Sequence, residues 1–555
     1  MTEPSILPPG DPATQLNHDR RRRDLARLRS SSPWDVLVVG GGITGVGVAL
    51  DAAARGLEVA LVEKHDFAFG TSRWSSKLVH GGLRYLAKGD VGVAWESAVE
   101  RATIGNRIAP HLLHKMPQVV PVYDGDTTTA MLVRASFLAA DMLRMAARTK
   151  RGTLDSGEFV GTEAALRLAP TLKREGLRGA VVSNELQLED DARLVTALAR
   201  TAAGYGARIL IGVEALELGP HSRLRVTDTG EVIDVTATHV INATGVWAGS
   251  LDPTITLQPS RGTHLVVPSA ALGWATGSLT VQVPDHFGRF VFTLPQADGL
   301  TYIGLTDEPV EGPVPDVPEA PDGDIQWILG VINTVLDTPL TSSDVVGTFA
   351  GLRPLLAPPG TGASEPSTGD GGAADQGEAE QRTHTADLSR RHAIVRHDNV
   401  ISVTGGKLTA YRRMAQDVVD LITTRPCRTT DIAAVGAGSV PPDDQIPARL
   451  VRRYGSEAAL VWSFGDEDPA LREPVAAGLP VLGVEMAFAV VWEGASRVED
   501  LLERRTRLSM SPEQAEAARP AATRILRDFA PVHVGTPGPR RESVGQTLGL
   551  PVTTG

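Results

Sequence analysis

The 555-residue sequence lacks four features that would each indicate a definite class of protein. It has one cysteine, Cys427, which excludes an intrachain disulfide framework and a multi-cysteine zinc or iron–sulfur site. It has no basic excess: 54 Lys and Arg oppose 66 Asp and Glu, and the net charge of −12 argues against non-specific nucleic-acid binding as the main activity. It has no long apolar run, since Pro268, Gly273 and Gly277 interrupt the longest charge-free stretch, 262–284. The N-terminus has neither a basic n-region nor an apolar h-region, so we expect no secretory signal.

What is present is typical of a soluble globular protein, with 22% charged and 42% apolar residues. At roughly 150 residues per domain, the length predicts two to four domains. Two segments lack the pattern of a core. Residues 1–33 are predicted to be a flexible basic tail, in which the run Arg20–Arg23 has two interpretations: a solvated tail, or attraction to an anionic membrane at about 1 kcal/mol per basic residue. Residues 357–387 contain no Val, Ile, Leu, Met, Phe, Trp or Tyr, which predicts a disordered insertion.

Regular structure is expected from Trp34. Residues 35–39 form a short apolar run that ends in glycines, as a buried parallel strand does. Residues 43–55 have helical periodicity with Gly56 as a C-terminal cap, and residues 57–63 read as a second buried strand. The order predicts a βαβ unit.

The turn between this first strand and the helix carries the spacing Gly40-x-Gly42-x-x-Gly45. Glycines allow a tight turn and close approach of the backbone, and the helix N-terminus then faces a pyrophosphate. Glu63 ends the following strand, where a carboxylate can accept hydrogen bonds from ribose hydroxyls. Together these features predict a dinucleotide site, and the acid favours an unphosphorylated ribose over NADP.

Three later segments return the chain to such a cofactor. Residues 240–245 and 403–409 are apolar strands that run into small-residue turns, and the helix after the second can stabilise negative charge on a reduced flavin by up to about 2 kcal/mol. In segment 70–85, the pair Gly81-Gly82 can lie against a flat ring. The same segment supplies hydroxyls for phosphates: Thr71, Ser72, Ser75 and Ser76.

From about Trp34 to Phe529, the motifs resemble those of the FAD-dependent, quinone-linked sn-glycerol-3-phosphate dehydrogenases. The motifs are GGGITG from Gly40, TSRWSSKLVHGGLRYL from Thr71, RGTHLVV from Arg261, GLRPL from Gly351, TGGKLTAYR from Thr404 and EDLLERRTRL from Glu499. SSKLVHGGLRYL combined with GGKLTAYR is far more specific than the glycine spacing alone. The resemblance implies an α/β fold, in which a Rossmann-like FAD-binding domain is interleaved with an antiparallel β substrate domain and followed by a helical C-terminal domain. The expected boundaries are 34–430 for the oxidoreductase region and 432–545 for the helical domain. Within the first, FAD-binding parts are expected at about 34–110, 180–260 and 390–430, and substrate parts at about 111–179 and 261–389.

The resemblance further implies oxidation of glycerol 3-phosphate to dihydroxyacetone phosphate by hydride transfer to FAD, with electrons passed to a membrane quinone. The residues suit this reaction. The forked guanidinium of an arginine binds a phosphate dianion through two hydrogen bonds, and a histidine, with an ordinary pKa near 6.5, can act as a general base. We expect His264 to be the base, Lys407 to stabilise alkoxide or ring charge, and Arg84 to act beside them. The expected substrate-binding residues are Arg84, Tyr85, His264, Arg353, Arg390 and Lys407. The insertion leaves open whether Arg390 or Arg391 is the second phosphate ligand, and Ser389 before Arg390 favours Arg390.

The predicted cofactor residues lie in the motifs above and at the ends of neighbouring strands. They are Gly40, Gly42, Ile43, Thr44, Gly45, Glu63, Lys64, Thr71, Ser72, Ser75, Ser76, Lys77, His80, Gly81, Gly82, Val213, Ala243, Thr244, Gly245, Gly406, Lys407, Leu408 and Thr409. No metal site and no nucleic-acid partner is expected. The family implies cytoplasmic location with peripheral or monotopic attachment to the inner face of the cell membrane, and leaves a homodimer open. Three alternatives remain: an oxidase that makes hydrogen peroxide, a flavin-binding tRNA-modifying protein, and a non-catalytic flavin sensor.

Overall fold

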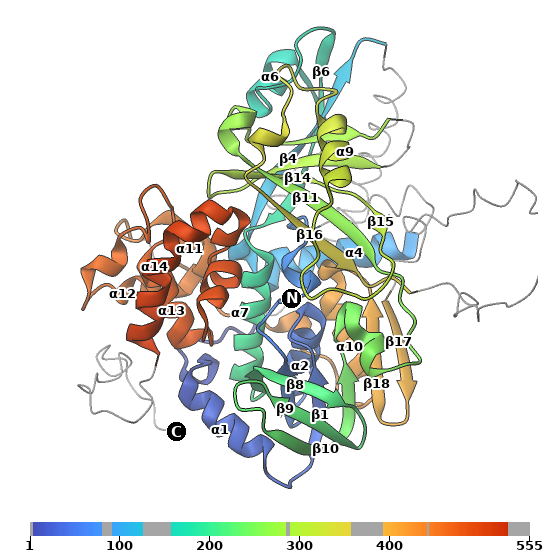
Figure 1. Cartoon of the computed structure of the whole chain (residues 1–555), viewed down its shortest axis with the longest axis vertical. Helices are drawn as coiled ribbons and strands as arrows, with labels where there is room; N and C mark the ends of the chain where they lie inside the picture. The colour runs from blue at the N-terminus through green and yellow to red at the C-terminus, as the bar shows by residue number, and fades with distance from the viewer. Residues whose placement is uncertain are drawn as a thin grey trace, which may run out of the picture.

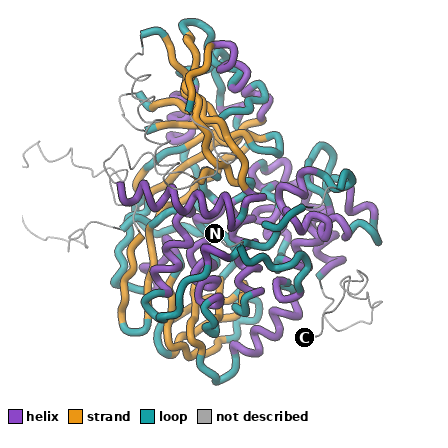
Figure 2. Tube along the Cα trace, turned by 180° about the vertical axis from the view of Figure 1, so that it is seen from behind, coloured by secondary structure: helices purple, strands orange, loops and turns teal. Residues whose placement is uncertain are grey.

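The computed structural model describes residues 4–79, 91–125, 157–284, 289–356, 392–440 and 443–530. Figure 1 shows one sheet in the lower part of the molecule, a second sheet in the upper part, and the C-terminal helices packed to one side of both. Figure 2, seen from behind, separates the same two groups of strands. The predicted insertion at 357–387 lies outside the described residues.

The lower sheet carries the predicted βαβ unit at its centre. Its strands follow the spatial order β17 (His392–His397), β18 (Val400–Gly405), β10 (Val232–Asn242), β1 (Trp34–Val39), β2 (Val59–Glu63) and β7 (Arg208–Ile211). Every neighbouring pair except β17–β18 is parallel, so the carboxyl ends of β1, β2, β10 and β18 lie at one edge. The antiparallel strands β8 (Val213–Glu217) and β9 (His221–Val226) extend β10.

Helices cover the centre of this sheet, which explains why its central strands β1 and β2 are almost wholly apolar. The helix α2 (Ile43–Ala54) packs between α7 (Asp191–Gly204) and α10 (Tyr411–Val419). Val36 and Val38 of β1 point into the core beneath α2, whereas Leu37 and Val39 belong to the core on the opposite face. The Rossmann-like α/β fold predicted from the sequence is thereby confirmed.

The upper sheet is antiparallel apart from the β12–β4 pair. Its strands follow the spatial order β15 (Glu308–Pro309), β11 (Ser260–Pro268), β14 (Leu300–Gly304), β13 (Phe290–Pro295), β12 (Ser278–Gln282), β4 (Leu113–Tyr123), β6 (Leu177–Leu188) and β3 (Leu78–Val79). Two more strands pair with members of this row: β16 (Gly347–Arg353) with β11, and β5 (Glu158–Gly161) with β6. Helices α6 (Thr162–Leu168) and α9 (Asp322–Ile332) contribute to the core on one face, where Leu265 and Val267 lie. Because side chains alternate along a strand, His264 is on the other face.

The C-terminal region is helical, as predicted. It contains α11 (Ala448–Tyr454), α12 (Ala458–Ser463), α13 (Gly483–Trp492) and α14 (Pro512–Phe529), with a π-helical turn at Asp500–Arg505. The helix α13 is apolar on nearly all sides because it is the centre of this core, where Phe488 meets the rings of Tyr454 and Phe464 edge-on.

The prediction of a flexible basic tail is wrong for residues 18–28. Residues His18–Leu28 form helix α1, which Asn17 caps, and Leu25 and Leu28 are buried against the lower sheet. The guanidinium of Arg20 donates to Asp24 Oδ2 at 3.0 Å and to the carbonyl of Ala207 at 3.0 Å. The basic run concealed an amphipathic pattern, because Leu25 and Leu28, three residues apart, share the buried face of the helix while Arg22 and Arg23 are exposed.

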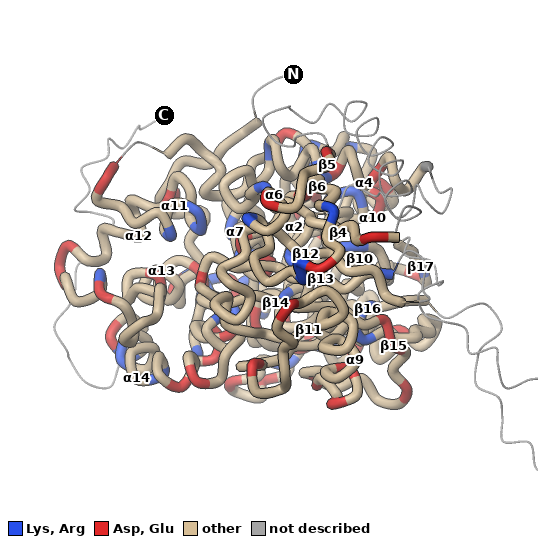
Figure 3. Tube along the Cα trace, turned by 90° about the horizontal axis from the view of Figure 1, so that it is seen from above, with Lys and Arg blue, Asp and Glu red and all other residues tan. Residues whose placement is uncertain are grey.

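No helix among the described residues is both long enough and apolar enough to span a membrane. Within the same ranges there is no cluster of three or more His, Cys, Asp or Glu side chains arranged to hold a metal ion. Figure 3 shows Lys and Arg interspersed with Asp and Glu along the described trace.

Candidate active site

The turn between β1 and α2 is packed against the end of β10. Gly40 has φ +115°, and a Cβ on it would lie 2.5 Å from the carbonyl oxygen of Ala243. A Cβ on Gly45 would lie 2.0 Å from the carbonyl oxygen of Gly40. Side chains are excluded at both positions, so the backbone of the turn is left open in front of α2.

The N-terminus of α2 has no cap from its own N-cap residue, Gly42. Instead, the backbone N–H of Ile43 donates to Ser72 Oγ at 2.9 Å. Free N–H groups at a helix N-terminus attract anions, and a serine hydroxyl beside them adds another donor. The predicted phosphate-binding position is therefore assembled from two segments, the glycine turn and the Thr71–Arg73 turn.

Glu63 holds the same turn from the end of β2. Its carboxylate accepts hydrogen bonds from the N–H groups of Gly41 and His65, both at 2.7 Å. Burial raises the pKa of Glu63, and these two N–H donors oppose that shift. Each oxygen keeps a lone pair, so the carboxylate can still accept a hydrogen bond from a diol.

We expect Glu63→Ala to weaken FAD binding, because it removes the acceptor and releases Gly41 and His65 from their hydrogen bonds. Losing hydrogen bonds to a charged group costs about 1.5–3 kcal/mol, which is roughly a 10- to 150-fold rise in the dissociation constant. Flavin released on dilution, followed by its fluorescence, measures this. Glu58→Ala is the matched control, since Glu58 immediately precedes β2 and its half-exposed side chain pairs with Arg27. Equal flavin retention by the two variants would remove Glu63 from the site.

A continuous cavity of about 890 Å³ runs from this turn to the upper sheet. Most of the predicted site residues line it: Gly40, Gly42, Ile43, Thr44, Glu63, Lys64, Thr71, Ser72, Ser75, Ser76, Val213, Ala243, Thr244, Gly245, His264, Arg353, Gly406, Lys407, Leu408 and Thr409. Six others lie outside the described residues: His80, Gly81, Gly82, Arg84, Tyr85 and Arg390. The volume of the cavity, the glycine turn and the carboxylate of Glu63 fit a flavin dinucleotide.

Among the described residues predicted to bind the cofactor, Gly45 and Lys77 do not line the cavity. The Nζ of Lys77 donates to Asp191 Oδ2 and to the carbonyls of Arg73 and Ser75, each at 3.0 Å. The side chain is buried, and burial lowers the pKa of Lys77 to about 8. A carboxylate from α7 holds the amine away from the cavity, which the local motif did not reveal.

His264 lies at the upper end of the cavity, on β11. Its Nε2 is 3.0 Å from Ser76 Oγ, and its ring stacks on Phe349 with centroids 4.5 Å apart. The side chain is buried, and this burial, followed by the positive charges of Lys77 and Arg353, holds the pKa of His264 well below its ordinary value. The imidazole is therefore neutral at physiological pH.

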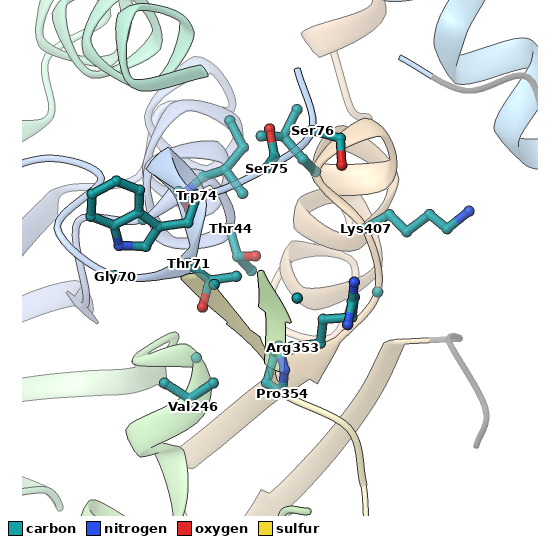
Figure 4. Close-up of a pocket in the computed structure, with 18 of the residues that line it drawn as sticks. Thr44, Gly70, Thr71, Trp74, Ser75, Ser76, Val246, Arg353, Pro354 and Lys407 are labelled. Atoms are coloured by element: carbon teal, nitrogen blue, oxygen red, sulfur yellow. The ribbon is translucent and has the colours of Figure 1, made fainter. Parts of the chain in front are cut away.

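Arg353 ends β16 beside His264. Its Nη1 donates to Ser260 Oγ at 3.2 Å and to Asp307 Oδ1 at 3.1 Å, and its Nη2 donates to the carbonyl of Thr306 at 3.2 Å. Figure 4 shows Arg353 and Lys407 on one side of the pocket, with Trp74 across from them. Lys407 precedes the 3₁₀ turn Leu408–Ala410 that leads into α10. Arg353, Lys407 and the neutral imidazole of His264 thus line the same cavity.

Some residues of the site were missed by sequence reasoning. Trp74 and Trp247 line the cavity, and Trp74 lies within a motif that was recognised, so its aromatic side chain was an available signal. Asp307 supports Arg353 and Asp191 anchors Ser75, but no local pattern marks either one. Their partners are 46 and 116 residues away in the sequence.

Comparisons with known proteins agree with this arrangement. Residues 35–430 match the family model of the FAD dependent oxidoreductases, and residues 402–530 match that of the C-terminal domain of alpha-glycerophosphate oxidase. The chain is 48% identical to glycerol-3-phosphate dehydrogenase 1 of Mycobacterium tuberculosis, over 92% of this chain and 98% of that protein. It is 30% identical to a mitochondrial glycerol-3-phosphate dehydrogenase of Arabidopsis thaliana, over 94% and 87% of the two chains. The crystal structure of the glycerol-3-phosphate dehydrogenase from Bacillus halodurans complexed with FAD superposes with a TM-score of 0.69 at 25% identity, covering 92% of this chain and 93% of that one.

Proposed function

The chain belongs to the family of FAD-dependent glycerol-3-phosphate dehydrogenases, and on that premise we propose that it oxidises sn-glycerol 3-phosphate to dihydroxyacetone phosphate and passes the electrons to a membrane quinone. The observation that carries this proposal is the position of a buried, neutral histidine beside an arginine, in the same cavity as a dinucleotide cradle. FAD, when bound, supplies the two-electron acceptor for a hydride.

The residues of the lower sheet hold the cofactor in this proposal. The glycine turn and Ser72 receive the pyrophosphate at the N-terminus of α2, and Glu63 accepts from ribose hydroxyls. Residues Gly405–Thr409 bring the start of another helix to the cavity wall, where N–H groups and Lys407 favour negative charge.

Arg353 binds the phosphate of the substrate. Its guanidinium is positioned by Asp307, Ser260 and the Thr306 carbonyl, so its orientation is set before the substrate arrives. A positioned fork binds a phosphate dianion with charge-assisted hydrogen bonds. Arg84, Tyr85 and Arg390 remain proposed substrate ligands from outside the described residues.

His264 accepts the proton of the secondary hydroxyl. In the tautomer with hydrogen on Nδ1, Nε2 carries the only lone pair of the ring. The hydroxyl of Ser76, 3.0 Å from Nε2 and also in the cavity wall, donates to that lone pair until the substrate hydroxyl replaces it as the donor. Loss of that proton to the imidazole, together with loss of the hydride from carbon, converts the alcohol to the ketone. Stacking on Phe349 fixes the plane of the imidazole ring. Little side-chain entropy is therefore lost when His264 is held in the orientation that accepts the proton.

The alternative is an oxidase, which the family model matched at residues 402–530 includes in its name. The two proposals differ in the electron acceptor, which is a quinone in a dehydrogenase and oxygen in an oxidase. Glycerol 3-phosphate should bleach the visible flavin spectrum of the purified protein without oxygen. We then expect a quinone analogue to restore the spectrum at least about tenfold faster than air, with little hydrogen peroxide formed. Rapid reoxidation by air with one peroxide per flavin would instead identify an oxidase, and absence of bleaching would contradict the proposed substrate. A quinone acceptor requires contact with lipid, so the proposal includes peripheral attachment to the cytoplasmic face of the membrane.

A further inference from the structure

One short segment of the C-terminal region lies against the loop that shapes the cofactor site. The segment is residues 500–507, named here the arginine segment, and it includes the π-helical turn Asp500–Arg505. The loop is residues 64–77, named here the flavin loop, and its regular structure is limited to the turn Thr71–Arg73. A loop with so little regular structure keeps one conformation only when side chains from other parts of the protein hold it in place.

Asp66 is the first point of contact between them. Its carboxylate accepts from Arg504 Nε at 2.6 Å and from Arg505 Nη1 and Nη2, both at 2.8 Å. All three side chains are at most 4% exposed. Burial alone would raise the pKa of Asp66, but the charges of Arg505 and Arg504 outweigh burial and lower that pKa to about 2. The carboxylate is therefore ionised and held by two guanidinium groups.

Two further contacts secure the other end of the flavin loop. Arg73 Nη1 donates to Glu503 Oε2 at 2.5 Å. Arg507 Nη1 lies 3.9 Å from Asp191 Oδ1, and Asp191 Oδ2 accepts from the N–H and hydroxyl of Ser75 at 3.0 and 2.7 Å. The arginine segment thus fastens the loop on both sides of its turn.

Two loop residues next to these contacts line the cavity: Ser72 lies between Asp66 and Arg73, and Ser76 directly follows Ser75. Ser72 reaches the N-terminus of α2 through its hydroxyl, and Ser76 reaches His264. We propose that the arginine segment is a positioning element for FAD: by fixing Asp66 and Arg73 it holds Ser72 at the phosphate position. The C-terminal domain thereby sets flavin affinity, although none of its described residues, 443–530, lines the cavity. By linkage, bound FAD strengthens the docking of that domain.

A buried ion pair that joins the same domains elsewhere provides the control. Arg200 of α7 donates to both carboxylate oxygens of Glu457, at 2.6 and 2.8 Å, and neither residue lines the cavity. Both side chains are at most 4% exposed, as around Asp66. Breaking this pair removes comparable interdomain contact without touching the flavin loop.

The test compares Asp66→Asn with Glu457→Gln in the full-length holoenzyme, without substrate, so that it stands apart from the proposed reaction. Release of FAD on serial dilution gives the dissociation constant. We expect Asp66→Asn to raise it about 10- to 100-fold, the range of ordinary coupling energies, and Glu457→Gln to change it less than about threefold even though its melting temperature falls. Amide hydrogen exchange in residues 66–77 should increase in Asp66→Asn only, and saturating FAD should reverse most of that increase.

Glu503→Gln is the milder variant, because Glu503 is 32% exposed. It should raise the FAD dissociation constant by a smaller factor than Asp66→Asn, and it decides the question if Asp66→Asn does not fold. Wild-type FAD affinity in Glu503→Gln and in any folded Asp66→Asn would overturn the proposal. An equal loss of affinity in Glu457→Gln would also overturn it, since the effect would then be general destabilisation.

Discussion

Replacing His264 by alanine should slow reduction of the bound flavin by glycerol 3-phosphate about 10²- to 10⁴-fold, the usual contribution of a general base. The substrate should still bind, because Arg353 is held by Asp307 and Ser260 rather than by His264. Rapid mixing under anaerobic conditions separates the rate of reduction from the dissociation constant of the substrate. The defect should shrink as pH rises, when hydroxide can accept the proton in place of the imidazole.

Two variants sharpen this prediction. Ser76→Ala removes only the hydroxyl 3.0 Å from Nε2 and should give a smaller loss than His264→Ala. His114→Ala is the matched control: His114 also lies in the upper sheet and contacts Gln187, but it is not in the cavity wall. If His264→Ala reduces the flavin at the wild-type rate, Lys407 becomes the next candidate for the base.

The pH profile of the wild type follows from the low pKa of His264. A base is active in its neutral form, and burial with the charges of Lys77 and Arg353 keeps the imidazole neutral well below pH 6.5. With glycerol, which carries no titrating phosphate, the ratio of reduction rate to dissociation constant should stay flat from pH 8 to pH 6. A fall with midpoint near 6.5 would mean that the histidine has an ordinary pKa and is not enclosed as described.

Replacing Arg353 by alanine should raise the KM for glycerol 3-phosphate about 10- to 150-fold, because a charge-assisted contact of about 1.5–3 kcal/mol is lost. The KM for glycerol should change much less, since glycerol has no phosphate to bind. Arg353→Lys should recover part of the loss through its charge but not the forked geometry. Steady-state kinetics on both substrates measure the split.

Arg261→Ala is the control for Arg353→Ala. Both arginines lie in the upper sheet, are 20% and 22% exposed, and pair with one aspartate, Asp324 and Asp307 respectively. Only Arg353 lines the cavity. If Arg353→Ala raised the KM for glycerol as much as the KM for glycerol 3-phosphate, the phosphate-binding role would be contradicted. The same holds if Arg261→Ala raised the KM for glycerol 3-phosphate as much as Arg353→Ala does.

The sequence pattern of a few neighbouring residues was enough to predict the strands and the turn that begin the lower sheet. The apolar runs around Val36–Val39 and Val59–Val62, with glycines between them, specify strand and turn over a few residues, and the structure has them as β1, the glycine turn and β2. The same reasoning failed before Trp34, where a run of arginines obscured Leu25 and Leu28, and helix α1 replaced the predicted tail.

The sequence by itself determined the cofactor cradle, because its glycines, helix and terminal carboxylate follow one another within about 25 residues and each is required by backbone geometry. Only the tertiary structure decided how side chains far apart in the chain are paired. Asp66 and Arg504 are 438 residues apart, Ser76 and His264 are 188 residues apart, and Lys77 is drawn from the cavity by Asp191, 114 residues away. Such pairs depend on how sheets and helices pack, and a charged side chain takes whichever buried partner that packing provides, because leaving it unpaired would cost several kcal/mol.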